Sequence, residues 1–297
     1  MARPLRIQYA GAVYHITSRG NAGNSIFKED KDRLTLLNAL EDVNDRYHWF
    51  CHAYCLMDNH YHLVIETPDG NLSKGMRHLN GVYTMRFNRN HHRVGHVLQG
   101  RYKAILIQKE SHLLEVCRYV VLNPVRAKMV RAPEAWGWSS YRGTAGIEKP
   151  HPCLTTEWIL MQFGARRRKA ERKFRDFMYD GIGGQTIWKD VKGQSLLGNG
   201  DFVDRLIDYV RGHEGVREIP KSQRYVSRPT LEKIFKDVEG RKGKRDLKIV
   251  DAVIRWGYNQ KEVADYLELH YSTISRLLKE VDLKISKLNG LLLKSPI

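Results

Sequence analysis

Two histidines separated by one residue, His60 and His62, are the side chains in this sequence best spaced to bind a metal ion. They lie in residues 58–66 (DNHYHLVIE), where Asp58 and Asn59 favour a turn and the following residues favour a strand. Side chains at positions i and i+2 of a strand share a face, so we expect both imidazoles to point the same way. Neutral imidazoles are common metal ligands. The pattern is short, however, and it also fits two ordinary histidines on a solvated sheet face.

A tyrosine and an asparagine further along the chain could complete such a site. Residues 111–126 (SHLLEVCRYVVLNPVR) contain Tyr119 and Asn123, which share one face of a helix because they are four residues apart. Apolar residues recur at helical spacing in this segment, and Ser111 is the expected N-cap. The residue before a proline disfavours the α conformation, so Pro124 should end the helix near Asn123.

Together these segments resemble the single-tyrosine HUH transposases, and more narrowly the REP-associated tyrosine transposases. The resemblance covers about residues 5 to 145 and rests on five motifs in a fixed order, which are more specific together than any one alone. In chain order the motifs are YHITSRGN at 14–21, CLMDNHYH at 55–62, GRYK at 100–103, YVVLNPVRA at 119–127 and WSSY at 138–141.

The resemblance implies a metal-dependent enzyme that cleaves single-stranded DNA beside a hairpin of the kind formed by repetitive extragenic palindromes. In such enzymes a tyrosine forms a covalent 5′-phosphotyrosine and frees a 3′-hydroxyl, so the strand can be rejoined without ATP. By this resemblance Tyr119 is the nucleophile, and His60, His62 and Asn123 bind Mg²⁺ or Mn²⁺. Zinc would suit the imidazoles equally well, so the residues alone do not fix the metal. Tyr102 is the second candidate nucleophile, and no residue is assigned as the base that accepts the phenol proton.

The order of expected elements predicts an α+β fold, an antiparallel sheet with helices packed on it. The resemblance also implies this fold, in its ferredoxin-like form. We expect the first helix to be capped by Asp30 or Asp32. The expected strands are 9–19, 49–56, 60–65 and 102–107, and the expected helices are 30–47, 71–87 and the one that carries Tyr119.

The rest of the chain predicts a second domain. We place the catalytic domain at 1–145, a basic connector at 146–200 and a helical DNA-binding domain at 201–297, with a helix-turn-helix near 246–282. The connector contains the run RRRK at 166–169, to which we assign no chemistry. In the expected second helix of the helix-turn-helix, the residues placed to meet base edges and phosphates are Ser272, Thr273, Ser275 and Arg276. The alternative is a three-helix packing module that touches no DNA.

The formal net charge of +17 indicates a polyanionic partner. We expect single-stranded hairpin DNA and duplex DNA, with Arg19, Arg101 and Lys103 as candidate phosphate contacts. An anionic membrane surface is the weaker alternative, because the basic residues are spread through patterned sequence. No apolar run is long enough to cross a bilayer and no signal peptide is evident, so we expect a cytoplasmic, nucleoid-associated protein. The sequence fits a monomer or a homodimer equally well.

Two other functions were weighed. The first is a DNA-binding regulator that keeps the HUH fold without catalysis. The second is a zinc-stabilised binding module that uses Cys51, Cys55, His60 and His62; its spacing differs from that of a zinc finger, which separates the two pairs by about 12 residues. The four cysteines fit reduced thiols in apolar surroundings better.

Overall fold

The structure is a computed structural model that describes residues 7–184, 187, 191–192, 196–199, 201–202, 206, 229–236, 238 and 242–279. The chain divides into two compact units. One unit is Leu5–Tyr209, and the other is Val210–Ile297 together with Met1–Pro4. Each unit is described by itself below.

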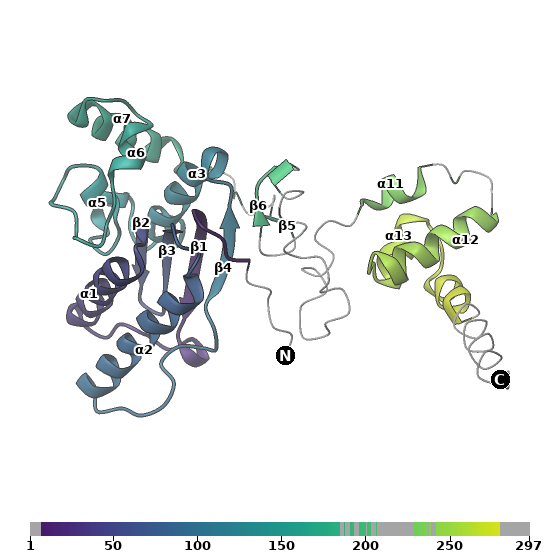
Figure 1. The fold of residues 1–297 in the computed structure, drawn as a ribbon, viewed down its shortest axis with the longest axis horizontal. Coiled ribbons are helices and arrows are strands. Elements are labelled where there is room, and N and C mark those ends of the chain that lie inside the picture. The colour runs from purple at the N-terminus through teal and green to yellow at the C-terminus, as the bar shows by residue number, and fades with distance from the viewer. Residues whose placement is uncertain are drawn as a thin grey trace. The chain divides into compact units, whose positions relative to one another are not determined.

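The first unit is built on a sheet in which the described residues form six strands, in the order β2-β3-β1-β4-β6-β5 (Figure 1). The four longer strands pair antiparallel, whereas β6 pairs parallel with β4. The strands are β1 (Ala12–Arg19), β2 (Phe50–Met57), β3 (His60–Thr67), β4 (Lys103–Ile107), β5 (Val191–Lys192) and β6 (Leu196–Leu197). This arrangement confirms the predicted α+β fold.

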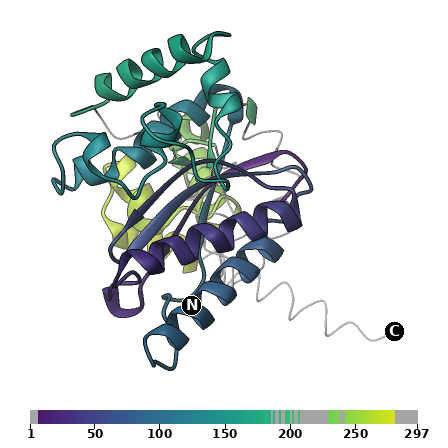
Figure 2. The ribbon, with the colours of Figure 1, turned by 90° about the vertical axis from the view of Figure 1, so that its left-hand side faces the viewer.

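Helices cover both faces of the sheet. Helices α1 (Asp30–Tyr47) and α2 (Leu72–Asn90) lie side by side on one face (Figure 2), where the Tyr61 hydroxyl donates to Asn80 of α2 at 2.6 Å. Helix α3 (Lys109–Val121) packs on the opposite face. Its apolar side chains share one hydrophobic core with residues of the sheet, including Val13, Cys55, Met57 and Val64.

Two predicted N-caps are wrong, although the predicted bounds of the first helix, 30–47, match α1. Helix α1 has Glu29 as its N-cap, and Asp32 is the third helical residue, where it accepts hydrogen bonds from the backbone N–H groups of Lys28 and Glu29 at 2.9 and 3.2 Å. This is a capping box, so the acidic residue acts from inside the helix rather than from the cap position. Helix α3 has Gln108 as its N-cap instead of Ser111, because the chain leaves strand β4 at Ile107 and turns into the helix at once.

The segment that we expected to connect the domains contributes to the core of the first unit. This segment forms the helices α6 (Glu157–Met161) and α7 (Arg167–Asp180). The remaining short elements of the unit are η1 (Asn21–Gly23), α4 (Asn123–Arg126), η2 (Pro133–Ala135) and α5 (Tyr141–Thr144). Buried side chains of α6 and α7 join the cluster around α3; they are Ile159, Leu160, Ala170, Phe174 and Met178. This packing holds α7 against the helix that carries Tyr119.

The outer edge of strand β2 is covered by the chain that follows α3. The backbone N–H groups of Leu56 and Thr155 donate to the carbonyls of Trp138 and Cys51, each at 2.8 Å. The N–H of Ser140 donates to the carbonyl of Tyr54 at 2.9 Å. Residues 138–155 therefore satisfy polar groups of an edge strand that would otherwise face water.

The second unit is helical in its described residues. Its elements are α11 (Leu231–Phe235), α12 (Lys242–Val250), the π-helical turn η4 (Asp251–Arg255), α13 (Gln260–Tyr266) and the helical residues 271–279. A capping box between Asn259 and Glu262 starts α13. Val263, Ala264, Ile274 and Leu278 are buried together in one small core. The start of the helical domain expected at 201–297 lies partly outside the described residues, and the end of the expected helix-turn-helix, at 280–282, lies wholly outside them.

In the described ranges, no helix combines the length and the apolar character needed to cross a membrane.

Candidate active site

Strand register brings His60 and His62 to the face of the sheet that packs against α3, which we call the histidine face. In β3 these histidines alternate with Tyr61, which points to α2. The residue opposite His62 on β1 is Thr17, and Arg19 lies opposite His60. Directly paired residues of antiparallel strands point to the same side, so Thr17 and Arg19 belong to the histidine face as well.

A third histidine lies in contact with His62. His15 of β1 is paired with Val64, two residues from His62, and is therefore its diagonal neighbour on the same face. His15 Nε2 and His62 Nδ1 share a hydrogen bond of 2.9 Å, and the two rings lie 4° from parallel. His62 Nε2 is buried without a hydrogen-bond partner among the described residues. Buried polar atoms are nearly always paired, so an unpaired buried nitrogen is a candidate to bind a metal ion.

His60 is oriented through its other ring nitrogen. His60 Nδ1 lies 2.7 Å from Oδ1 of Asn59. The amide of Asn59 is itself fixed, because its Nδ2 donates to the carbonyl of Gly23 at 3.1 Å. An amide oxygen only accepts hydrogen bonds, so His60 Nδ1 carries the proton and Nε2 carries the lone pair. A hydrogen bond to one ring nitrogen that frees the other for a ligand is typical of metal-binding histidines.

Burial favours the neutral form of all three imidazoles. It lowers the pKa of His15 to about 3. The pKa of His62 is well below its ordinary value because of burial and because His15 and His60 lie nearby. Burial, followed by the charge of Arg19, also lowers the pKa of His60. The neutral form is the one that can bind a metal ion.

Tyr119 lies beside this group of histidines. Its ring centroid is 6.1 Å from that of His15 and 6.2 Å from that of His62, and its plane is nearly perpendicular to both, at 83° and 81°. The guanidinium carbon of Arg126 lies 5.4 Å from the centre of the Tyr119 ring. The tyrosine is half-buried, so part of its side chain is accessible to solvent. A phenol and a guanidinium group therefore lie beside the imidazoles.

The other candidate nucleophile lies elsewhere. The hydroxyl of Tyr102 is 3.4 Å from Oγ of Ser73 in α2. The ring thus points to the face of the sheet opposite to His60 and His62. This placement favours Tyr119 over Tyr102.

Asn123 begins α4, directly after α3. Its amide Nδ2 donates to the carbonyls of Tyr119 and Val120 at 3.0 and 3.3 Å. Within the described residues it has no hydrogen bond to His60 or His62. The amide nitrogen is engaged with the end of α3 and the amide oxygen remains to accept, so its role as a ligand stays a prediction.

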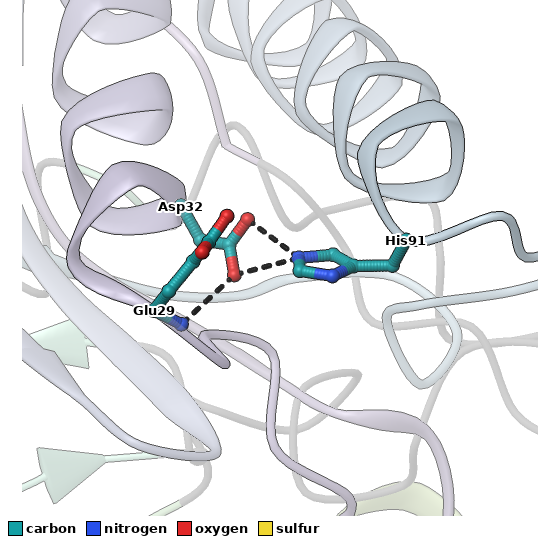
Figure 3. Close-up of side chains that lie close together, drawn as sticks. All are labelled: Glu29, Asp32 and His91. Carbon is teal, nitrogen blue, oxygen red and sulfur yellow. Dashed lines mark hydrogen bonds and ion pairs between the residues drawn. The ribbon is translucent and has the colours of Figure 1, made fainter.

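The other arrangements of ligands fit less well. Cys51 and Cys55 are buried free thiols, and no described cluster combines them with His60 and His62 at metal-ligand distances. The described residues do contain one acidic group spaced for a cation, formed by Glu29, Asp32 and His91, whose ligand atoms lie within 4.8 Å of one another (Figure 3).

That acidic group has a structural role. His91 Nε2 lies 2.8 and 2.9 Å from the two carboxylate oxygens of Asp32, and Asp32 also accepts the capping hydrogen bonds of α1 (Figure 3). Asp32 is fully buried, and its hydrogen bonds join the start of α1 to the end of α2. The protein itself thus occupies the acceptor sites that a cation would need.

The residues predicted to contact DNA are distributed over both units. Arg19 and Lys103 are exposed; Lys103 lies opposite Thr17, so it belongs to the histidine face. Arg101 is exposed just before β4. In the second unit, Ser272, Thr273 and Arg276 are exposed on the helical residues 271–279, and Ser275 is half-buried. None of these residues is assigned to DNA by the geometry alone.

Three residues of the site were missed from the sequence. His15 and Arg126 lie within motifs that carry the resemblance, at 14–21 and 119–127, and Asn59 lies in the turn before His60. The signal for His15 was its place in an expected strand, but its contact with His62 depends on strand register, which hydrophobic pattern does not give. Arg126 follows Tyr119 by seven residues, two helical turns, which could have indicated a shared face.

The first unit is similar to a known protein family over part of the chain. Residues 8–123, less than half of the sequence, match the family model described as IS200-like transposase. The match spans the strands β1 to β4 and the helix that carries Tyr119, and it supports a DNA-processing role. No curated protein matches the chain.

Solved structures similar to the chain include two transposases. A REP-associated tyrosine transposase bound to a REP hairpin has a TM-score of 0.44 and 17% identity, over 49% of this chain and 86% of its own. A protein from Deinococcus radiodurans R1 that is described as a transposase has a TM-score of 0.30 and 17% identity, over 40% and 95%. A tRNA(His) guanylyltransferase from Saccharomyces cerevisiae has a TM-score of 0.32 and 9% identity, over 65% and 86%.

Proposed function

We propose that the first unit is a transposase domain, a metal-dependent single-stranded DNA endonuclease and strand transferase that acts beside hairpin DNA through a covalent 5′-phosphotyrosine. The observation that carries the proposal is the position of Tyr119. Its ring lies about equally far from His15 and His62, on the sheet face where His62 presents a buried nitrogen without a partner.

The reaction would proceed by exchange of one phosphate ester for another. The Tyr119 hydroxyl loses its proton and attacks the phosphorus, and the bond from phosphorus to the 3′-oxygen breaks. That oxygen takes up a proton and leaves as a 3′-hydroxyl, while the phosphate stays on the tyrosine. Attack by a 3′-hydroxyl on the phosphotyrosine reverses the step and joins strands. Because no residue is assigned as the base, water would accept the phenol proton.

The residues present fit a divalent cation. His60 and His62 would hold it through their Nε2 atoms, with the Asn123 amide oxygen as a third donor; two nitrogens and an oxygen suit Mn²⁺ or Mg²⁺. When bound, such a cation supplies Lewis-acid stabilisation of the charge that gathers on the phosphate oxygens. Arg126, close to the Tyr119 ring, would hold the same phosphate electrostatically.

His15 would act as a positioning residue for His62. If His62 Nδ1 donates to His15 Nε2 across their 2.9 Å contact, the lone pair of His62 lies on Nε2, the buried atom without a partner. A partner that fixes ring orientation and tautomer commonly raises metal affinity by 10- to 100-fold. Asn59 would do the same for His60 through Nδ1.

The second unit would bind duplex DNA through a helix-turn-helix. Helix α13 and the helical residues 271–279 are joined by a short turn in which Glu268 has a φ of 54°. Ala264 is buried between them with Ile274, where a small side chain allows close approach. Ser272, Thr273 and Arg276 are exposed at the start of the second helix, where a recognition helix meets bases and phosphates.

The test is formation of a covalent adduct. We would incubate the full-length protein with a labelled hairpin that carries a single-stranded flank, in Mn²⁺ or Mg²⁺, and separate the products on a denaturing gel. The wild type should give a protein–DNA band and a free 3′-hydroxyl product. Tyr119→Phe removes one oxygen and keeps the ring, so hairpin binding should persist while both products fall by at least about 10³-fold.

Tyr102→Phe is the matched control. It removes the same atom from the opposite sheet face, so it should cleave as the wild type does. An adduct that persists in Tyr119→Phe and disappears in Tyr102→Phe would assign the nucleophile to the other tyrosine. A wild type that binds hairpins but never forms an adduct would favour a regulator that binds DNA without catalysis.

A further inference from the structure

Helix α7 carries a band of positive charge on its exposed side, which we call the α7 basic surface. Its opposite side is buried, because Ala170, Phe174 and Met178 recur every four residues and pack into the core of the first unit. The helix is thus fixed to the domain rather than solvated all round. The surface consists of exposed side chains at the start and middle of the helix: Arg166, Arg168, Lys169, Arg172 and Lys173.

Helix stability does not account for these charges. Positive side chains near a helix N-terminus oppose the helix dipole, and like charges four residues apart repel each other, as Arg168 and Arg172 do. Arg167, in the same turn, is paired with Glu171 at 2.9 Å. In the described part of the chain, the residues of the α7 basic surface form no ion pair. Their charge lowers the stability of the helix slightly and remains available to an anionic partner.

The other end of α7 lies beside the nucleophile. The guanidinium of Arg118, the residue before Tyr119, stacks 4.2 Å from the ring centre of Phe177 and donates to its carbonyl at 3.2 Å. The approach is close: a Cβ added at Gly181 would lie 2.5 Å from Cδ of Arg118. Arg126, whose guanidinium lies over the Tyr119 ring, donates to the carbonyl of Gly184 at 3.5 Å. The C-terminal end of α7 therefore lies near the proposed nucleophile, and the basic surface lies toward its N-terminal end.

We propose that the α7 basic surface binds the sugar-phosphate backbone of the double-stranded stem next to the strand that Tyr119 cleaves. This inference rests on the proposed function, because it places the duplex relative to that reaction. The 14 residues of α7 extend about 20 Å, which corresponds to about six base pairs at 3.4 Å each. Basic side chains on a rigid helix would fix the distance from the stem to the scissile phosphate without reading sequence.

The geometry favours DNA over a membrane. A helix that lies on a lipid surface inserts an apolar face into it, whereas Ala170, Phe174 and Met178 of α7 are already buried in the protein core. The nucleophile at one end of the helix also provides a reason for a polyanion to lie along it.

The test compares two sets of charge removals in the full-length protein. The first variant is Arg168→Ala, Lys169→Ala, Arg172→Ala and Lys173→Ala together. The control removes four exposed charges from α1 and α2, on the opposite face of the sheet: Lys31→Ala, Lys74→Ala, Arg77→Ala and Arg89→Ala. Fluorescence anisotropy at several salt concentrations would measure the affinity of each for a hairpin with a single-stranded flank and for the flank alone.

The α7 variant should bind the hairpin at least about tenfold more weakly than the wild type. The slope of log affinity against log salt should become shallower by about 3 to 4, because each lost phosphate contact removes about 0.9. Binding of the flank alone should change less than twofold, and the control should lose less than the α7 variant. The charge-keeping pair Arg168→Lys and Arg172→Lys should bind as the wild type does.

Several outcomes would overturn the inference. Equal losses in the α7 variant and in the control would mean that affinity follows net charge alone. An equal loss for the hairpin and for the flank would place the single strand on α7 instead of the stem. Unchanged hairpin affinity in the α7 variant would mean that the hairpin does not contact this surface. Binding of an acidic protein or of phosphatidylserine vesicles to the wild type that is lost in the α7 variant would then assign the surface to another partner.

Failure of this inference and failure of the proposed function are separable. A wild type that forms the adduct, with an α7 variant that binds hairpin normally, refutes the inference and keeps the function. A wild type that forms no adduct, with an α7 variant that loses hairpin binding, does the reverse. Circular dichroism and thermal unfolding of both variants show whether α7 still packs through Phe174.

Discussion

The two ends of strand β3 bury polar groups on the same sheet face in opposite ways. At one end, both carboxylate oxygens of Glu66 are paired, with Lys109 Nζ at 2.6 Å and His52 Nε2 at 2.8 Å. At the other end, His62 shares one nitrogen with His15 and leaves Nε2 buried without a partner. Removing one partner of a buried ion pair is strongly destabilising, whereas an unpaired buried acceptor costs stability until something binds it.

The paired group at Glu66 and the partly unpaired group at His62 have different roles within one domain. Lys109 is the first residue of α3, so its ion pair with Glu66 fixes the start of the helix to the sheet. Tyr119 lies near the end of the same helix, with its ring centroid 6.2 Å from that of His62. Glu66 and Lys109 thus position the start of the helix, and the end of the helix places Tyr119 beside His15 and His62. The comparison makes four predictions.

The largest effect is expected from His62→Phe. The phenyl ring fills a similar volume and removes the buried Nε2 that has no partner, but it also removes the hydrogen bond to His15. The two effects oppose each other, so the free energy of unfolding should change by less than about 1 kcal/mol. Formation of the covalent adduct should fall by at least about 100-fold, because a ligand has been removed. Thermal unfolding and the denaturing gel measure the two effects. A variant that is strongly destabilised would show that the His15–His62 contact is an anchor like Glu66.

Glu66→Ala should do the opposite. It leaves Lys109 and His52 without their partner, and breaking a buried ion pair costs about 3 kcal/mol. Adduct formation per folded molecule should stay within about threefold of the wild type, since the histidine end is untouched. Chemical denaturation measures the loss, and Glu110→Ala, at an exposed neighbouring position, is the control. A large loss of activity at full folding would mean that the ion pair also sets the position of Tyr119.

Substitutions of His15 test whether its hydrogen bond to His62 matters for metal binding. His15→Phe keeps the ring and removes the hydrogen bond to His62, so Mn²⁺ should bind about tenfold more weakly. Electron paramagnetic resonance of Mn²⁺ titrated into the protein measures this affinity without any DNA. His15→Gln, which can still hydrogen-bond, should recover part of it. Unchanged affinity in His15→Phe would show that His62 needs no partner to bind the metal.

The smallest effect is expected in acid. Desolvation raises the pKa of Glu66, but the hydrogen bonds and charges of His52 and Lys109 lower it more, so it lies below its ordinary value. A carboxylate with a lowered folded-state pKa stabilises the protein above its unfolded-state pKa and loses that contribution as the pH falls through the folded-state pKa. The stability difference between the wild type and Glu66→Gln should therefore be constant near neutrality. It should shrink as the pH falls below the ordinary pKa of a glutamate side chain. A difference that does not change with pH would contradict the assigned ion pair.

Much of the fold could be predicted because local patterns determine it. The alternation around His60 and the apolar spacing around Tyr119 indicated the elements that the structure contains. The N-cap of α3 could not be predicted, since Gln108 caps this helix only because strand β4 ends directly before it. The contact of His15 with His62 depends on the pairing of β1 with β3, and a shift of one residue would have turned His15 to the other face.

The role of α7 was missed for a different reason. Its run of basic residues suggested a connector, and the buried side chains Ala170, Phe174 and Met178 are few and widely spaced among the charges. Only their packing against α3 shows that the helix belongs to the first unit.

The covered edge of strand β2 has a consequence for how copies of this protein can meet. Because residues 138–155 already bond the backbone of Cys51, Tyr54 and Leu56, a second chain cannot extend the sheet there by strand addition. A fragment that ended near Ala145 would lose the bond from Thr155 and uncover part of that edge, so it should be prone to aggregation. A homodimer of the full chain would therefore have to form elsewhere than by continuation of the sheet at β2.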